Sequence, residues 1–324
     1  MNARLNRQGS CHLCPGAIMK QLTLTPRPPF DFSRTAAIFS TGDPDIRSFM
    51  NDVFRQVLDT GNHRILAEVR SSGSTEDPAL RITLRSPRTI TDRDARRAAA
   101  LLGSVLSIDD DPGLFYRAVS GDPVLSALTV RLRGVRAPVT PTVFEALTDS
   151  IIEQQISLAA ARSIENRLIR ATGKRLSLDG AVYYCYPGPS ALAKTSDTIF
   201  RSCGLTIRKG EYIRDISRQI IDGELDIEAF REYPDTEQII SELVKIRGIG
   251  RWTAELTILR GLHRPDVFPA DDAGVRRFIS KFYLSGRKLT AAEARIFSER
   301  WGSWKGFAAY YLEVADHLGI DPAG

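Results

Sequence analysis

Leu243-Val-Lys-Ile-Arg-Gly-Ile-Gly-Arg-Trp-Thr-Ala-Glu-Leu256 is the stretch that decides the fold of this chain. Its apolar residues predict a helix that ends at Ile246 and a second helix that follows a short turn. Gly248 and Gly250 allow that turn to be tight, because glycine adopts backbone conformations that are closed to other residues. The stretch therefore predicts a helix-hairpin-helix over about 236–262.

The turn of this hairpin suits a polyanion. Backbone N–H groups at the start of the second helix can bind a phosphate, and basic side chains surround the turn. A Gly-x-Gly between helices is, however, often only a helix end followed by a turn. The candidate residues for binding a phosphate backbone are Gly248, Gly250, Arg247, Arg251 and Thr253.

A second informative segment, Asp266-Val-Phe-Pro-Ala-Asp-Asp-Ala-Gly-Val275, follows the hairpin. We expect an extended Phe-Pro loop over about 266–275 that delivers two carboxylates, Asp271 and Asp272, to the start of another helix. Aspartate is favoured as a helix N-cap, so a purely structural role is open to both residues. From the residues alone, a cap and a catalytic carboxylate cannot be told apart here.

Hairpin and loop together resemble the helix-hairpin-helix Gly/Pro-Asp superfamily of DNA glycosylases, and within it the 3-methyladenine DNA glycosylase II branch. Three further stretches are similar to that branch, and the likeness covers roughly residues 110–320. They are Phe144-Glu-Ala-Leu-Thr-Asp-Ser-Ile-Ile-Glu-Gln-Gln-Ile-Ser-Leu-Ala-Ala-Ala161, Gly204-Leu-Thr-Ile-Arg-Lys-Gly-Glu-Tyr212 and Arg300-Trp-Gly-Ser-Trp-Lys305.

The resemblance implies which carboxylate is catalytic. Asp272 keeps the family's spacing to a following apolar residue, Val275, and so takes the catalytic position, which leaves Asp271 as the helix cap. Cleavage of an N-glycosidic bond builds positive charge on the sugar. A nearby carboxylate stabilises that charge and can orient or deprotonate the attacking water.

The resemblance also implies a wedge and a base pocket. Gln154 and Gln155 lie where the family places the base-flipping wedge that fills the gap left in the duplex, with Gln155 at its tip. Trp252, Leu256 and Glu313 align with the base pocket. Relatives in this branch can place aromatic residues at the last two positions, so Leu256 and Glu313 leave the preferred lesion open.

The chain is expected to lack a covalent nucleophile as well as a metal or cofactor. Bifunctional relatives carry a lysine nucleophile two residues past the second glycine of the hairpin, where this chain has Trp252. An iron–sulfur cluster needs four closely spaced cysteines after the catalytic domain, and the last cysteine here is Cys203. Cys11 and Cys14 supply only half of a zinc site. Binding of a monovalent cation at the hairpin is the one possibility left open.

Composition favours a cytoplasmic protein with a polyanionic partner. The formal net charge is +5 and the sequence pI is about 9.1, and the four cysteines are too few for a disulfide framework in 324 residues. No stretch has the apolar length of a signal peptide or a membrane span. We expect a cytoplasmic, nucleoid-associated monomer with no membrane partner.

The fold is expected to be mostly helical. A flexible tail over 1–19 precedes an N-terminal α+β domain with an antiparallel sheet over 20–112. An all-helical body of two lobes, which contains the hairpin and the catalytic loop, follows over 113–324.

Individual elements of the N-terminal domain follow from its periodicity. A first strand is expected near Gln21. Alternation of apolar and polar residues predicts two further strands over 64–70 and 80–85. Apolar spacings of three and four residues predict a helix over 45–58, and a second helix is expected from Thr91 to about Ser107.

We therefore expect a monofunctional DNA-3-methyladenine glycosylase II-like hydrolase. It would flip out and excise damaged bases, alkylated or deaminated purines, from double-stranded DNA in base excision repair. A bifunctional glycosylase for oxidised bases is one alternative, which Trp252 disfavours. A non-catalytic helix-hairpin-helix DNA-binding protein is the other, which Asp272 disfavours because a carboxylate facing DNA would repel phosphate.

Overall fold

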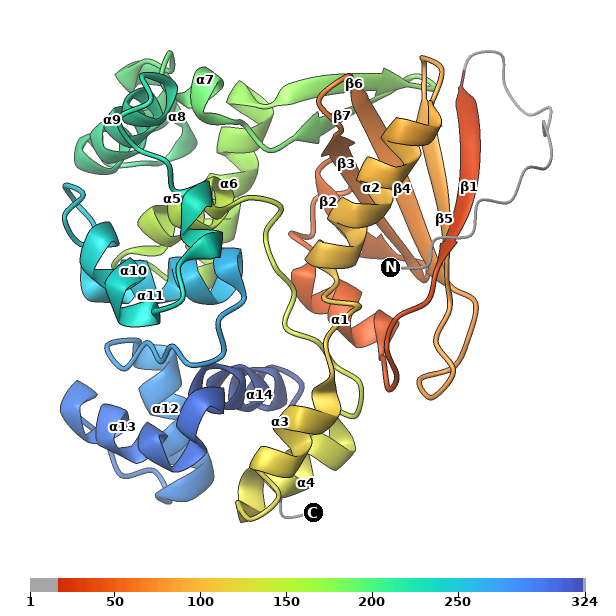
Figure 1. Cartoon of the computed structure of the whole chain (residues 1–324). Helices are drawn as coiled ribbons and strands as arrows, with labels where there is room; N and C mark the ends of the chain where they lie inside the picture. Colours follow the sequence, from red (N-terminus) through yellow and green to blue (C-terminus); the bar gives the residue numbers. More distant parts are fainter. Residues whose placement is uncertain (1–16, 323–324) are drawn as a thin grey trace. The chain divides into compact units, whose positions relative to one another are not determined.

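The computed structural model describes residues 17–322 (Figure 1). They form two compact units, one of residues up to Asp110 together with Ile152–Leu225, the other of Asp111–Ile151 together with the chain from Asp226 onward. The domain borders expected near residues 19 and 112 stay predictions, and Cys11 and Cys14 lie outside the described residues. Among the described residues, no helix has the length and apolar character needed to cross a membrane.

A five-stranded antiparallel sheet dominates the first unit, with the strand order β1-β5-β4-β3-β2. The three expected strands are confirmed as β1, β4 and β5. The strands are β1 (Ile18–Leu24), β2 (Arg47–Met50), β3 (Val53–Asp59), β4 (Arg64–Ser71) and β5 (Leu80–Ser86).

The helix predicted over 45–58 is wrong, because this segment forms the hairpin of β2 and β3. Met50 pairs with Val53, so the turn between the strands consists of Asn51 and Asp52 alone. Both turn residues have a left-handed backbone, with φ of 51° and 57°, a conformation that asparagine and aspartate tolerate better than other side chains. The apolar spacing is that of two strands separated by a turn, which imitates a helical period.

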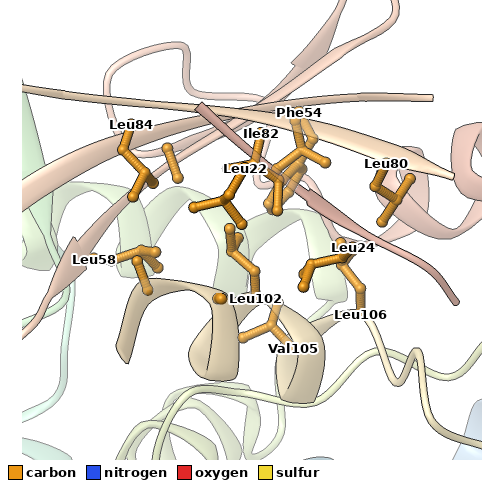
Figure 2. Close-up of a cluster of buried hydrophobic side chains, with 14 of the residues drawn as sticks. Leu22, Leu24, Phe54, Leu58, Leu80, Ile82, Leu84, Leu102, Val105 and Leu106 are labelled. Atoms are coloured by element: carbon orange, nitrogen blue, oxygen red, sulfur yellow. The ribbon is translucent and has the colours of Figure 1, made fainter. Parts of the chain in front are cut away.

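One face of the sheet carries the main apolar core of the unit. Helix α2 (Asp92–Val105) lies over this face, and Figure 2 shows its Leu102 pointing toward the strands. Val105 of the same helix belongs to this core. Successive strand residues point to opposite faces, so Phe54 and Leu58 of β3 enter this core. The helix expected from Thr91 to about Ser107 is confirmed.

The opposite face of the sheet is covered by a second hairpin, β6 (Lys174–Leu178) and β7 (Ala181–Cys185). Leu176 and Leu178 pack there against Val57 and Leu66. The expectation of an all-helical body after residue 112 is therefore wrong, because residues 174–185 form two strands. The Asp179-Gly180 turn, with φ of 51° and 79°, is the signal of a two-residue hairpin.

The remaining regular elements of the described chain are helices, which confirms a mostly α fold with an N-terminal antiparallel sheet. The first unit also contains α1 (Phe32–Phe39), α6 (Leu158–Thr172), α7 (Pro189–Leu192), α8 (Asp197–Cys203) and α9 (Ile207–Ile221). Helix α5 (Val143–Glu153) crosses the border between the units. The second unit contains α3 (Pro112–Ala118), α4 (Pro123–Arg131), α10 (Thr236–Leu243), α11 (Arg251–Thr257), α12 (Ala273–Tyr283), α13 (Ala291–Ser298) and α14 (Lys305–His317).

The start of α2 offers a test of stability. Thr91 and Asp94 form a reciprocal capping box, and Asp94 also accepts hydrogen bonds from Thr60 and Asn62 while it is almost fully buried. We expect Asp94→Ala to lower the free energy of unfolding by about 2 kcal/mol, because it removes half of the capping box and a hydrogen-bond acceptor of the buried Thr60 hydroxyl. Urea unfolding measures the loss.

The free energy of unfolding that Asp94→Ala loses should depend on pH. The Thr91 hydroxyl, with the other donors, lowers the pKa of Asp94 to about 2 from 3.8. A lowered native pKa contributes stability that is full above the unfolded value and is lost as pH falls through the native value. The difference between wild type and Asp94→Ala should therefore narrow below pH 4. The exposed box of Thr290 and Glu293 on α13 is the control, since Glu293→Ala should cost less.

Candidate active site

The expected helix-hairpin-helix is present in the second unit. Helix α10 ends at Leu243, three residues before the expected end, and the chain continues in hydrogen-bonded turns to Ile249. Gly250 then caps α11, which runs on into a π-helical turn over 258–262. Ile249 is buried, so it anchors the hairpin turn in the core.

The two glycines of the hairpin have different roles. Gly248 has a φ of 89°, a left-handed conformation that costs other residues free energy. Gly250 has an ordinary φ of −92°, and a Cβ atom added there would meet no atom within 4 Å. Gly248 therefore shapes the turn, whereas Gly250 leaves open space at the start of α11.

The basic side chains of the hairpin differ in their surroundings. Arg247 is exposed, as its predicted backbone role requires. Arg251 lies against two carboxylates, with Nη2 2.5 Å from Glu237 Oε1 and Nε 2.8 Å from Glu255 Oε1. The Thr253 side chain is buried, so a contact with a phosphate at this position would use its backbone N–H.

The loop that follows the hairpin is held firmly within the second unit. The Gly306 N–H donates to the Pro265 carbonyl at 2.7 Å, and the Asp272 N–H donates to the Pro269 carbonyl at 2.9 Å. A Cβ atom added to Gly306 would lie 2.6 Å from the Val267 carbonyl oxygen, so only glycine lets α14 approach so closely. Phe268 is almost fully buried, which completes the anchoring.

Asp272, and not Asp271, is the N-cap of α12. Its Oδ1 accepts the Val275 N–H at 3.0 Å, so the expectation that Asp271 caps the helix is wrong. Asp271 is exposed instead, with Oδ2 3.9 Å from an Arg295 nitrogen. The loop turns one residue later than expected, because the Asp272 N–H bonds back to Pro269.

A second donor orients the Asp272 carboxylate. Trp252 Nε1 donates to Asp272 Oδ2 at 3.0 Å, a contact that sequence analysis missed because the two residues lie on different helices. Trp252, which the sequence resemblance aligns with the lysine of bifunctional glycosylases, thus bonds directly to the carboxylate. Each carboxylate oxygen keeps a further lone pair, so Asp272 can still bind water.

The sequence of this chain is similar to a family of known proteins and to individual members of it. Residues 148–303 match the family model described as HhH-GPD superfamily base excision DNA repair protein. The DNA-3-methyladenine glycosylase of Bacillus subtilis is 30% identical over 81% of this chain and 86% of its own length. This chain belongs to the HhH-GPD superfamily.

Solved structures of the superfamily share the fold. The 3-methyladenine DNA-glycosylase from Archaeoglobus fulgidus matches with a TM-score of 0.80 and 26% identity, over 91% of this chain and 98% of that protein. The 3-methyladenine DNA glycosylase of Schizosaccharomyces pombe, solved in complex with abasic DNA, matches with a TM-score of 0.53 and 27% identity, over 64% of this chain and 98% of that protein.

The predicted pocket residues lie in the same unit as Asp272. Leu256 is buried in α11 one helical turn after Trp252, and Glu313 is half-buried on α14, beyond the matched residues of the HhH-GPD model. Burial first, and then the nearby Glu313 charge, raise the pKa of the Tyr310 phenol well above its usual value. The roles of Trp252, Leu256 and Glu313 in binding a base stay predictions.

The predicted wedge lies at the turn between α5 and α6, in the first unit. Gln155 is exposed and has a left-handed backbone, with φ of 58°. Next to it, Ile156 and Leu158 are also exposed although apolar, at 38% and 44%. The turn thus presents an amide and two apolar side chains to solvent, which are groups that could fill a gap in a base stack.

Proposed function

We propose that this protein is a monofunctional DNA glycosylase that hydrolyses the N-glycosidic bond of alkylated purines in double-stranded DNA. The observation that carries the proposal is the Asp272 carboxylate. It is held by the Val275 amide and the Trp252 indole at the end of a buried loop, in a chain that belongs to a base excision repair superfamily. A relative that is 30% identical is named a DNA-3-methyladenine glycosylase.

The chemistry follows from the position of this carboxylate. As the base departs, positive charge develops on the sugar, and a fixed negative charge stabilises that transition state more than the ground state. Asp272 also orients or deprotonates the attacking water. The two donors hold it in one orientation, so little reorganisation is needed during the reaction.

Hydrolysis without a covalent intermediate is supported by Trp252. A lyase needs an amine at this place to form a Schiff base with the sugar, whereas the indole N–H here bonds to Asp272. The alternative of a bifunctional enzyme for oxidised bases is thus disfavoured. Borohydride reduction during turnover should trap no covalent protein–DNA complex, and a trapped complex would restore that alternative.

DNA binding by the hairpin leads to a paired prediction. We expect Gly250→Ser to keep the stability of the protein, because serine is a favoured N-cap, but to weaken duplex binding about tenfold by filling the open space where a phosphate approaches. Gly248→Ser should instead lower the free energy of unfolding by about 1–2 kcal/mol. Urea unfolding and fluorescence anisotropy with duplex DNA separate the two effects. Unchanged affinity in Gly250→Ser would remove Gly250 from the DNA contact.

We also propose that the reaction needs no cofactor. Within residues 17–322, no group of three or more His, Cys, Asp and Glu side chains is arranged to hold a metal ion. Dialysis against EDTA should leave the excision rate unchanged. Exchange of potassium for lithium in the buffer tests the separate idea of a monovalent cation at the hairpin turn, where it would alter DNA affinity and not the rate of the bound complex.

The proposal is tested by base release from defined duplexes. Single-turnover reactions with DNA that contains 3-methyladenine, 7-methylguanine or hypoxanthine should release an alkylated purine, and chromatography of the free base identifies which one. Binding without release of any of these bases would favour the non-catalytic DNA-binding protein. The cellular site that we propose is the cytoplasm at the nucleoid, because that is where the DNA substrate lies.

A further inference from the structure

Three residues of the segment Gly204-Leu-Thr-Ile-Arg-Lys-Gly210 have a clear structural role. Gly204 ends α8 in a left-handed conformation, with φ of 98°. Thr206 caps α9 through a hydrogen bond from the Lys209 N–H. A Cβ atom added to Gly210 would lie 3.1 Å from the Phe200 side chain, so the glycine lets α9 pack closely on α8. These contacts fix the first turn of α9, where the Lys209 side chain originates.

The Lys209 ammonium group lies at the carboxyl end of α5. Nζ donates to the Ile152 carbonyl at 2.8 Å and to the Gln154 carbonyl at 2.6 Å. Between them, the Glu153 carbonyl accepts the Ile156 N–H at 3.3 Å. Three successive carbonyls at this helix end are thus bonded, two of them by one positive charge that also suits the negative end of the helix dipole.

Burial of the charged Lys209 side chain costs free energy of hydration. Lys209 is half-buried, and burial lowers the pKa of its ammonium group. A half-buried charge persists where its hydrogen bonds compensate for lost hydration. The turn that receives these bonds carries Gln155, whose left-handed backbone is otherwise unfavourable for a side chain of this kind.

We propose that Lys209 is a positioning residue that holds the α5–α6 turn in the conformation that enters the DNA at the damaged base. This inference rests on the proposed glycosylase function and adds a residue to it. By fixing the carbonyls of Ile152 and Gln154, Lys209 presents Gln155, Ile156 and Leu158 on a rigid turn. A rigid wedge loses little conformational entropy when it enters the base stack, so more of its binding free energy favours the flipped base.

Two other roles for Lys209 fit the contacts less well. A nucleophile needs an unprotonated amine with its lone pair directed at the sugar, whereas this Nζ donates to two carbonyls within its own unit. A direct phosphate contact would use an exposed ammonium group, and this one is half-buried against a helix end.

The test compares Lys209→Met, which keeps the length of the side chain without charge or donors, with Lys209→Arg, which keeps both. Hydrogen exchange of the full-length protein without DNA reports on the turn. We expect the Ile156 amide to exchange about tenfold faster in Lys209→Met, in line with the loss of a charge-assisted hydrogen bond, while amides of α8 and α2 keep their protection. Lys209→Arg should restore most of the protection.

Single-turnover excision of 7-methylguanine or 3-methyladenine is the second measurement. We expect Lys209→Met to lower the rate of the bound complex about tenfold, with unchanged affinity for undamaged duplex, and Lys209→Arg to recover it. Unchanged exchange at the turn, or a fast turn with an unchanged excision rate, overturns the inference while the proposed function stands. If wild type excises nothing, the proposed function fails, and hydrogen exchange still decides whether Lys209 orders the turn.

Discussion

Asp272→Asn is expected to lower the single-turnover rate of base release by about 10²–10⁴-fold, the range typical for loss of a catalytic carboxylate or base. The amide cannot carry the negative charge that stabilises the sugar cation, and it does not deprotonate water. Asparagine is nonetheless a favoured N-cap, so its oxygen can accept the Val275 N–H as Asp272 does. The variant should therefore fold and bind duplex DNA.

The neighbouring carboxylate provides a matched control. Asp271 is exposed and precedes Asp272 in the same loop, so Asp271→Asn removes the same charge without changing the cap. Quenched-flow excision assays, with circular dichroism and duplex binding for each variant, measure the contrast. A loss of release in Asp271→Asn alone would assign catalysis to the other residue, and equal release from all three proteins would exclude both.

The fold was predictable wherever local chemistry and periodicity agreed. Strand β5 alternates cleanly between buried and more exposed residues, and the capping box at Thr91 marks the start of α2. The prediction for segment 45–58 was wrong because the two-residue turn at Asn51-Asp52 interrupts the alternation between two strands. The apolar residues on either side of the turn then have a spacing like that of a helix. In this segment and at Asp179-Gly180, the dipeptide that favours a left-handed turn was the more informative signal.

The site was predictable as a set of residues and not as a set of contacts. The hairpin and the loop could be found from their glycines and carboxylates, because these residue types have strong local preferences. The contact between Trp252 and Asp272 depends on how α11 and α12 pack, which no local pattern encodes. The same is true of Arg251, which sequence places beside a phosphate and the structure places against Glu237 and Glu255.

Glu255 is the buried centre of an ion-pair network within the second unit. Only 1% of its side chain is exposed, and Oε1 lies 2.8 Å from Arg251 and 3.0 Å from Arg295. Arg295 also donates to the Phe268 carbonyl at 3.3 Å. The network therefore connects α11 of the hairpin to the loop that ends at Asp272.

We expect Glu255→Ala to lower the free energy of unfolding by about 3 kcal/mol, the lower end of the cost of breaking a buried ion pair. The cost stays at that end because Arg251 and Arg295 are partly exposed, at 43% and 34% of their side chains, and can be rehydrated. Glu255→Gln should lose less, since its amide oxygen still accepts a hydrogen bond. Urea unfolding of the three proteins at one pH measures both differences.

The pH dependence of the glutamine variant shows which force dominates at Glu255. Burial raises the pKa of this carboxyl above its ordinary 4.5, against the opposing effect of Arg295 and Arg251. A raised native pKa means that the stabilising contribution is full below the unfolded value and is lost as pH rises through the native value. The deficit of Glu255→Gln relative to wild type should therefore shrink from pH 4.5 toward neutrality. A deficit that grows over this range would mean that attraction by the two arginines outweighs the burial of the charge.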